Sequence, residues 1–340
     1  MLTYTIRRLV LAVPTLLFIA LVIFLLLLLA PGDPLANMAL SIPPEVRESM
    51  REALGLGRPW YIRFGLFLYQ FFVVEPQYII DAMLGTDFAQ GKQRIISFAS
   101  RSPVFDVIAE RIPQTLWVVG MSYVVGVLIA LPIGIISAYK QYSIFDQIGT
   151  LISMIGFSVP TFFTGIVLIL IFSSYIPNDS IFWLPSKYDT LHVVEDWESF
   201  KYQVRQMAMP VFVLALFNAA QISRYMRASM LDNLGQDYVR TARAKGMSER
   251  IVVLKHVLRN SMIPVITVIA LGVPQVFGGA IITEQVFGVN GLGGYLINSI
   301  QGNDVPAVMT LTFLFAILIV LFNLIADVLY GVLDPRIRYD

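Results

Sequence analysis

The feature that most constrains the fold is an apolar run from Leu9 to Ala30, which contains no charged residue. A helix needs about 20 mostly apolar residues to cross the hydrocarbon core of a bilayer. The run follows Arg7-Arg8 and stops at Pro31-Gly32, a pair that disfavours further helix. A cleaved signal peptide would have a shorter apolar core, of about 7–15 residues, and a small-x-small cleavage site. We therefore expect residues 1–30 to form a retained N-terminal anchor helix.

Five further segments are apolar enough to cross a membrane, at about 115–138, 147–172, 206–223, 262–282 and 305–332. The segment 206–223 is the weakest of them, because Asn218 and Gln221 interrupt it. Only 14% of the residues are charged, whereas a soluble domain carries about a quarter. We predict an all-α membrane protein with about six transmembrane helices. The chain, 1–340, is then one transmembrane domain, with an outer segment at 31–114 and a five-helix core at 115–332.

The distribution of lysine and arginine predicts the orientation. With the N-terminus inside, the cytoplasmic segments hold thirteen of these residues and the short outer loops hold three. The long segment 31–114 counts little, because long segments translocate largely regardless of charge. We expect both termini to be cytoplasmic and 31–114 to be an enlarged periplasmic segment. Within it, residues 42–56 have the pattern of a surface helix. The aromatic stretch 58–74 fits either an interfacial helix or a packed outer cap, and we favour the cap.

The cytoplasmic segment 224–261 carries eight basic and three acidic residues. We predict a short helix over 237–245 that ends at Gly246 in a C-terminal cap position. Ser248 can then cap a second helix, in which Ile251, Leu254 and Leu258 share a face. Two interpretations remain open at this stage. The basic residues can anchor the loop on anionic lipid, or the segment can be a docking element for a protein.

Small residues favour docking, because Ala242, Ala244 and Gly246 permit close approach to a partner surface. Asp237, Arg240 and Arg243 are candidate ionic contacts in that interface, although a solvated charged face is an alternative. Thr241 and Lys245 complete the candidate docking segment.

Little in the chain predicts chemistry of its own. No G-x-x-x-x-G-K-[ST] motif is present, so ATP hydrolysis would have to come from another subunit. There is no cysteine, and His192 and His256 are predicted on opposite sides of the membrane, so we expect no metal site. A net charge of +1 gives no case for nucleic-acid binding. A membrane-bound enzyme would lack any nucleophile, base or metal constellation.

Polar residues inside spans are candidates for function. Asn218 and Gln221 can line a pathway or bond to a neighbouring helix. Asn323 and Asp327 lie on one face of the last span. A polar contact between helices is the simpler interpretation, and the alternative is that Asp327 is the carboxylate of a proton-coupled carrier. Four glycines, at 288, 291, 293 and 294, predict a compact outer turn.

Several motifs together resemble one family. They are Asp237-Tyr238-Val239-Arg240-Thr241-Ala242-Arg243-Ala244-Lys245-Gly246, Ile6-Arg7-Arg8-Leu9, Arg111-Ile112-Pro113-Gln114, Glu284-Gln285-Val286-Phe287-Gly288 and Asp334-Pro335-Arg336. This set is similar to the permease subunits of binding-protein-dependent ABC importers, in the dipeptide/oligopeptide branch. The resemblance covers nearly the whole chain. The wider ABC-importer loop usually has Glu-Ala-Ala where this chain has Arg240-Thr241-Ala242, a form that the peptide branch also shows. The chain departs from the family where Asn290 replaces proline and over 77–100.

The resemblance implies a type I ABC importer permease fold in the bacterial inner membrane. It implies that the loop 224–261 couples to cytoplasmic ATPase subunits, and that the chain forms half of the translocation pathway. The implied partners are a second permease, more typically different than identical, two ATPase subunits, an extracytoplasmic solute-binding protein and membrane lipid. No cofactor is expected on this chain, while ATP and Mg²⁺ would bind the ATPase subunits. Peptide is the implied solute, with nickel, oligosaccharide and glutathione left open. A self-sufficient secondary carrier or channel is the alternative.

Overall fold

The computed structural model describes residues 2–29, 45, 57–278 and 280–333. The surface helix expected over 42–56 lies outside these residues except for Glu45, and so do the expected helix stop at Pro31-Gly32 and the basic Arg336 and Arg338. Throughout the described residues the secondary structure is helical, with one isolated β-bridge between Ile96 and Pro103. The expected all-α fold is therefore confirmed.

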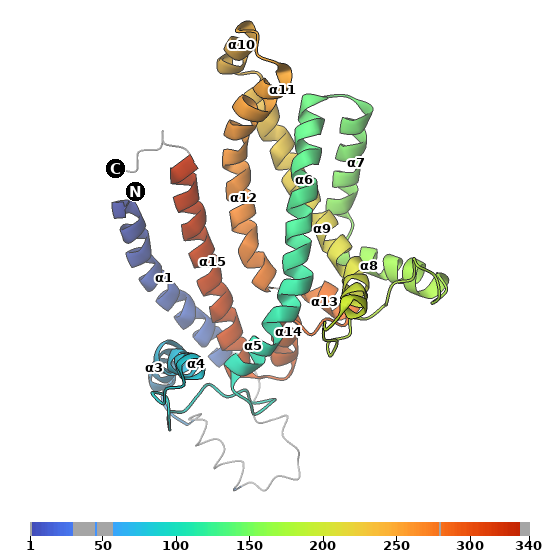
Figure 1. The fold of residues 1–340 in the computed structure, drawn as a ribbon. Helices are drawn as coiled ribbons and strands as arrows, with labels where there is room; N and C mark the ends of the chain where they lie inside the picture. The colour runs from blue at the N-terminus through green and yellow to red at the C-terminus, as the bar shows by residue number, and fades with distance from the viewer. Residues whose placement is uncertain (1, 30–44, 46–56, 279, 334–340) are drawn as a thin grey trace. The chain divides into compact units, whose positions relative to one another are not determined.

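The helices follow one another along the chain as shown in Figure 1. Four of the segments (η1 to η4) are π-helical turns, which continue the helices next to them. The elements are α1 (Leu2–Leu29), α3 (Trp60–Tyr69), η1 (Gln70–Val74), α4 (Glu75–Leu84), α5 (Val104–Thr115), η2 (Leu116–Gly120), α6 (Met121–Tyr139), α7 (Ile144–Ser158), α8 (Thr161–Ile169), η3 (Leu170–Tyr175), α9 (Trp197–Leu234), α10 (Asp237–Ala244), α11 (Glu249–Ile251), η4 (Val252–Val257), α12 (Leu258–Gly278), α13 (Ile281–Phe287), α14 (Leu292–Gln301) and α15 (Val305–Leu333).

Five helices in the described part of the chain are long and apolar enough to span a membrane, and a bent pair makes up to six. Five of the six expected spans thus appear as single helices. The segment 206–223, the weakest in the sequence, lies inside the 38-residue helix α9. The expectation that the third span is one continuous helix over 147–172 is wrong. The span breaks between Ser158 and Thr161, and α7 meets the helix after it at 99°. Pro160 at the break lacks the N–H that a continuous helix requires.

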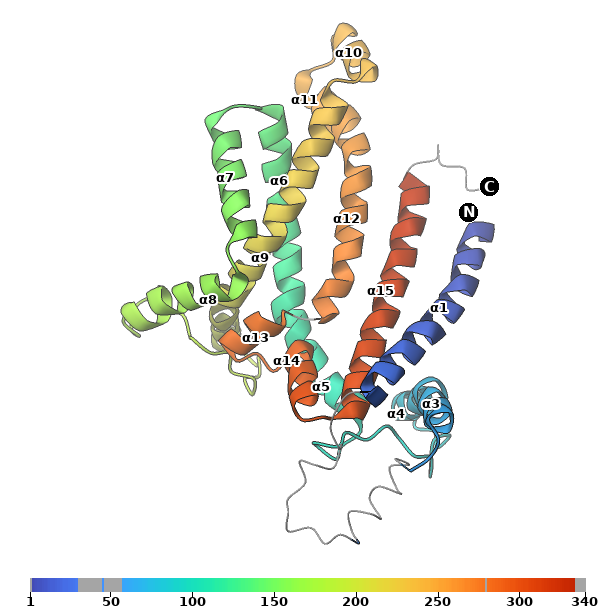
Figure 2. The same ribbon diagram turned by 180° about the vertical axis from the view of Figure 1, so that it is seen from behind.

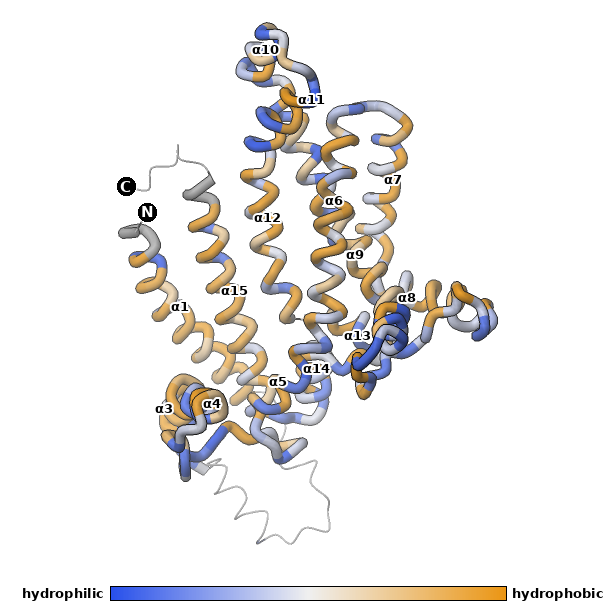
Figure 3. Tube along the Cα trace, viewed as in Figure 1, coloured by the Kyte–Doolittle hydropathy of each residue, from blue (hydrophilic) through white to orange (hydrophobic). Residues whose placement is uncertain are grey.

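The chain folds as two units. The first contains the described parts of 1–10, 113–294 and 318–340, and the second those of 11–112 and 295–317. In the first unit α6 packs along α9, with α7 and α12 also against α9 (Figures 1 and 2). Its main core lies around the fully buried Met226 and Met230 of α9. In Figure 3, α6 and α12 show long hydrophobic stretches, as expected of helices that cross a membrane.

Glycines allow α6 to approach α9 closely. A Cβ atom at Gly134 would lie 2.6 Å from Met226 Cβ and 2.7 Å from the Ser223 carbonyl oxygen. A Cβ atom at Gly126 would lie 2.9 Å from Asn218 Cβ. Small residues at such contacts replace side-chain packing with direct backbone contact, a common arrangement between membrane helices.

The second unit is built around an aromatic cluster. Phe67 and Phe71, both buried, lie against Phe313 of α15 with ring centroids 6.1 and 4.9 Å apart. The opposite side of the same helices is exposed and apolar, and includes Trp60 and Tyr69. The aromatic stretch 58–74 therefore packs as a cap on one side, as the favoured interpretation predicts, and presents an exposed apolar face on the other.

Carboxylates attach the segment 77–100 to the rest of this unit. The buried Glu75 accepts hydrogen bonds from Ile95 N–H (2.9 Å) and from Arg94 (2.8 Å), and Arg94 also pairs with Asp106 at 2.8 Å. The buried Asp304 accepts N–H bonds from Phe98 at 3.0 Å and Ala99 at 3.2 Å, together with the Ser97 hydroxyl. The segment that departs from the family pattern is thus fixed by charge-assisted hydrogen bonds.

Candidate functional site

An exposed helical tip lies between α9 and α12. Helix α9 ends at Leu234, the short helix α10 follows over Asp237–Ala244, and the chain returns through α11 and η4 into α12. Gly246 has φ +73°, a conformation that side chains other than glycine rarely adopt. Its N–H bonds to Arg243 O at 2.9 Å and the Met247 N–H bonds to Ala242 O at 3.3 Å. These two bonds form a Schellman motif, so the predicted glycine cap is confirmed.

The outward face of α10 consists of Asp237, Arg240, Thr241 and Ala244, all exposed and spaced at i, i+3, i+4 and i+7. Lys245 and Gly246 are exposed next to them. Arg240 makes only a 3.4 Å contact with Asp237 Oδ1, with both side chains largely in solvent. A cationic, small-residue surface is therefore presented at the end of the helix pair, and we call these six residues the tip face.

Two parts of the expected tip geometry differ in the structure. Ala242 is 6% exposed and packs inward with Val239 against Val252, so it supports the tip from inside and does not belong to the tip face. The helix after Gly246 packs through Val252, Val253 and Val257, while Ile251 and Leu254 are about half exposed; the face expected over 251, 254 and 258 is therefore not the buried one. The π-helical turn η4 has a wider repeat than an α-helix, which changes which residues face inward.

Arg243 connects the two arms of the tip. Its guanidinium binds Glu249 through two hydrogen bonds, Nη2 to Oε1 at 2.7 Å and Nε to Oε2 at 3.1 Å. The hydrogen bond to Glu249 raises the pKa of Arg243 above its ordinary value. Ser248 occupies the N-cap position of α11, but its side chain makes no capping bond there. The arms are thus held by the ion pair and by the apolar contacts beneath it.

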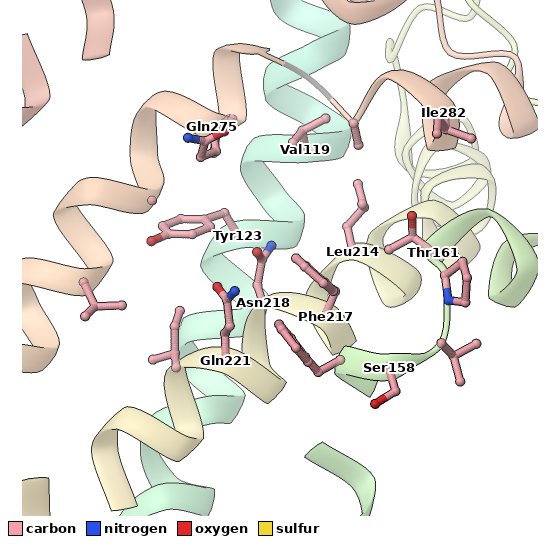
Figure 4. Close-up of a pocket in the computed structure, with 18 of the residues that line it drawn as sticks. Val119, Tyr123, Ser158, Thr161, Leu214, Phe217, Asn218, Gln221, Gln275 and Ile282 are labelled. Carbon is pink, nitrogen blue, oxygen red and sulfur yellow. The ribbon is translucent and has the colours of Figure 1, made fainter. Parts of the chain in front are cut away.

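A pocket of about 890 Å³ lies in the same unit, between α6, α7, α8, α9, α12 and the start of α13 (Figure 4). Asn218 and Gln221 of α9 project into it from one wall and Gln275 of α12 from another. The bend between α7 and α8 supplies Ser158 and Thr161. None of the described residues that line this pocket is charged.

The amide groups at the pocket are available to a ligand. Within the described part of the chain, the side chains of Asn218, Gln221 and Gln275 form no hydrogen bond to protein groups. The Tyr123 hydroxyl, by contrast, donates to the Ile269 carbonyl oxygen at 2.6 Å. A Cβ atom at Gly272 would lie 2.2 Å from that hydroxyl oxygen, so glycine there leaves room for it. The structure therefore places Asn218 and Gln221 together on a pocket wall, where the sequence left their role open.

An ion pair between α7 and α9 was missed in the sequence. Asp146, at the start of α7, binds Arg227 of α9 with Nε–Oδ1 at 2.7 Å and Nη2–Oδ2 at 2.8 Å. The Asp146 side chain is only 4% exposed. A single acidic residue at the start of an apolar run is the signal that could have indicated it, but its partner is 81 residues away.

Asn323 and Asp327 are not brought to the pocket. Asp327 Oδ2 lies 3.3 Å from Arg8 Nη1, which links the end of α15 to the start of α1, and Figures 1 and 2 both show these helix ends side by side. Asn323 is exposed. This arrangement is the contact between helices that the sequence favoured for Asp327.

The glycine-rich turn surrounds a buried carboxylate. Glu284 of α13 is 1% exposed and accepts the Gly294 N–H at 2.9 Å. A Cβ atom at Gly291 would lie 2.4 Å from Glu284 Oε1, and one at Gly293 would lie 2.9 Å from Oε2. Gly288 ends α13 with φ +68°. The compact turn expected over these glycines is therefore present, and it encloses Glu284. The described residues contain no cluster of three or more potential metal ligands.

Comparison with known proteins identifies the class. Residues 130–339 match the family described as binding-protein-dependent transport system inner membrane component, and residues 1–119 match the N-terminal domain of such components. The chain belongs to this family, whose members are permease subunits of ABC importers. Membership in this family identifies the chain as a transport component of the inner membrane, in place of the alternative of a self-sufficient carrier.

Two relatives match over the full length of both chains. The oligopeptide transport system permease protein AppB of Bacillus subtilis is 36% identical over 340 residues. The glutathione transport system permease protein GsiC of Escherichia coli is 37% identical over 340 residues. Among solved structures, an amino acid ABC transporter with histidines matches with TM-score 0.48 and 13% identity, over 66% of this chain and 94% of its own. The expected membership in the peptide-type branch is confirmed by the first two relatives.

Proposed function

We propose that this chain forms half of the translocation pathway of an ATP-driven peptide importer, with the 890 Å³ pocket as part of the pathway wall and the tip face as the docking site for a cytoplasmic ATPase subunit. One observation carries the proposal: the unbroken helix α9 contains two of the three pocket amides, Asn218 and Gln221, and also the residue that leads into the tip. Leu234 lies 13 residues beyond Gln221, about 20 Å along the helix axis.

Both arms of the tip continue into pocket walls. Helix α9 carries Asn218 and Gln221, and α12, which follows the second arm, carries Gln275. A rigid displacement of the tip by an ATPase would therefore move two walls of the pocket together. Such transmission is a coupling free energy between the nucleotide site and the pathway, carried by packed helices.

The proposed assembly follows the family arrangement. It contains a second permease, expected to be a different chain, two ATPase subunits that bind ATP and Mg²⁺, and an extracytoplasmic solute-binding protein. Both termini are proposed to be cytoplasmic, since thirteen lysine and arginine residues then lie in cytoplasmic segments and three in the short outer loops. The tip face would then meet the ATPase through Ala244 and Gly246, with Arg240 and Lys245 beside them.

The lining of the pocket favours a peptide as solute. Amide side chains donate and accept hydrogen bonds to a peptide backbone without selecting a charge. The names of the two relatives refer to oligopeptide and glutathione transport, and both of these solutes are peptides. Nickel is disfavoured at this site, because its preferred ligands are not among the described lining residues.

Copurification tests the docking assignment. The tagged chain, coexpressed with its permease partner and ATPase subunits, is purified in mild detergent as wild type, as Ala244→Glu and as Lys140→Glu. Ala244 is exposed on the tip face, so a larger, charged side chain there blocks close approach without entering the core. We expect Ala244→Glu to retain the permease partner and lose the ATPase subunits.

Lys140→Glu is the matched control, because Lys140 is also exposed, on the turn between α6 and α7 and outside the tip. It should keep all subunits. Retention of the ATPase subunits by Ala244→Glu would refute the docking role of the tip face.

Uptake into proteoliposomes tests the solute class independently. The complete transporter with its binding protein is supplied with a labelled neutral dipeptide, glutathione, a trisaccharide or Ni²⁺. We expect ATP-dependent uptake of the peptides only, and reduced peptide uptake in Gln221→Leu, which keeps the approximate size of the side chain and removes its amide. Uptake of the trisaccharide or Ni²⁺ alone would overturn the peptide assignment.

A further inference from the structure

A second pocket, of about 260 Å³, lies within the second unit and is lined by arginine side chains. It is formed by the end of α1, by α3, by the segment 93–98 and by the first turn of α15. Its lining combines apolar groups, among them Phe24, Phe67 and Met309, with three arginines, Arg58, Arg63 and Arg94.

The three arginines differ in their partners. Arg94 is neutralised by Glu75 and Asp106, each at 2.8 Å. Arg58 and Arg63 form no ion pair or hydrogen bond through their side chains within the described part of the chain. Arg63 lies over the Phe24 ring, with Cζ 6.0 Å from the centroid, and burial lowers its pKa from the ordinary value. A guanidinium remains charged in proteins, so the pocket holds two cations for which the described residues supply no counter-charge.

The pocket lies at the end of two membrane spans. Phe24 is in the last turns of the apolar helix α1, which ends at Leu29, and Val305 and Pro306 begin the apolar helix α15. The end of one span and the start of the next mark the edge of the hydrocarbon layer, where lipid headgroups lie. The pocket is therefore at headgroup level.

The neighbouring helices present a lipid-compatible surface. Trp60 (48% exposed) and Tyr61 (60%) lie at the start of α3, and Met83 (80%) and Leu84 (73%) at the end of α4. Aromatic residues with a polar edge are enriched at membrane interfaces, and a helix with one exposed apolar face lies in the interface plane. In Figure 3, α3 and α4 are predominantly hydrophobic beside the end of α1.

We propose that this pocket binds the phosphate headgroup of an anionic phospholipid, with Arg58 and Arg63 as its ligands and with the acyl chains lying along α1 and the exposed face of α3 and α4. Arginine is suited to this role because its planar fork matches phosphate oxygens in two parallel hydrogen bonds. The volume of the pocket is smaller than the roughly 300–1,000 Å³ of sites that enclose a drug-sized ligand. It therefore takes a headgroup and leaves the chains in the bilayer.

Native mass spectrometry of the assembled transporter tests the proposal. The delipidated complex is titrated with dioleoylphosphatidylglycerol or with dioleoylphosphatidylcholine, as wild type and as Arg58→Gln/Arg63→Gln. Near a membrane surface each arginine contributes about 1 kcal/mol to the binding of anionic lipid, so removing both should weaken the tightest phosphatidylglycerol site about 30-fold. Phosphatidylcholine binding should not change.

Arg101→Gln is the matched control, since Arg101 is an exposed arginine of the same unit that does not line the pocket. It should bind phosphatidylglycerol like wild type. Should the double variant fail to assemble, Arg58→Gln alone, with an exposed side chain, is expected to weaken binding about fivefold.

Three results would overturn the proposal. Unchanged phosphatidylglycerol binding in the arginine variants would show that the pocket is not the lipid site. Displacement of the lipid by equimolar glycerol phosphate would assign the pocket to a free phosphate compound. Loss of the solute-binding protein from the variants, with lipid binding intact, would assign it to a protein contact.

Discussion

Replacing Gly134 by alanine tests whether the contact between α6 and α9 is the structural centre of the first unit. The new Cβ atom would meet Met226 Cβ at 2.6 Å and the Ser223 carbonyl oxygen at 2.7 Å, and the second of these is a backbone atom. Real Cβ contacts are not this short, so α6 and α9 must separate locally. Overpacking of this kind costs about 1–3 kcal/mol.

Gly120→Ala is the matched control in the same continuous helix. There the nearest atoms to a new Cβ, Leu116 Cδ2 and Val276 Cγ1, lie at 3.7 Å, an ordinary van der Waals distance. Both variants gain the same helix propensity, about 1 kcal/mol for alanine over glycine. The propensity cancels in the comparison, so Gly134→Ala should be less stable than Gly120→Ala by the overpacking cost alone, about 1–3 kcal/mol.

Thermal unfolding of the detergent-purified complex measures the difference. We expect Gly120→Ala to melt at or above the wild-type temperature and Gly134→Ala several degrees below it. Peptide uptake should fall in Gly134→Ala even below its melting temperature, since α9 carries the pocket amides of Asn218 and Gln221. Equal melting temperatures for the two variants would refute the close approach of α6 to α9.

Further substitutions test the Asp146–Arg227 ion pair between α7 and α9, and the glycine that ends α10. Asp146→Asn leaves Arg227 without its bidentate partner. Breaking a fully buried ion pair lowers the free energy of unfolding by about 3–5 kcal/mol. Because the Arg227 side chain is 29% exposed, we expect a smaller loss of about 2–3 kcal/mol, measured by thermal unfolding. The double variant Asp146→Asn/Arg227→Gln should recover part of this loss, and no recovery would contradict a pairwise interaction. Gly246→Asn should retain more of the ATPase in copurification than Gly246→Val, because asparagine tolerates positive φ and a β-branched residue does not. Equal retention by both would show that the left-handed turn is dispensable.

The two pockets illustrate different uses of polar groups in a membrane protein. The amides of Asn218, Gln221 and Gln275 are neutral, so a pathway can contain them without a permanent counter-charge. Arg58 and Arg63 are charged, and a counter-charge must come from outside the described chain. The neutral amides suit a solute that is bound only transiently, whereas the two arginines suit an anionic lipid that stays bound.

Local features of the sequence determined much of this protein. The apolar runs predicted where the chain crosses the membrane, because the cost of placing polar residues in hydrocarbon depends on composition and length alone. The sequence also predicted the end of α10, because the hydrogen bonds that end the helix at Gly246 join residues at most five positions apart. The peptide-importer resemblance also followed from short motifs, and the family comparison confirmed it.

Contacts between distant residues were decided only by the tertiary structure. Pro160 indicated that a helix could break, but the 99° angle between α7 and the helix after it appears only in the tertiary structure. Ala242 was assigned to docking because it is small, whereas the packing of Val239 and Val252 turns it inward. Arg227 forms an ion pair with Asp146, and the Arg63 guanidinium lies over the Phe24 ring. In both cases the two residues are far apart in the sequence, so no local pattern predicts the contact. Helix formation depends on neighbours in sequence, while pockets and ion pairs depend on which helix faces meet, and that choice is made by packing over the whole fold.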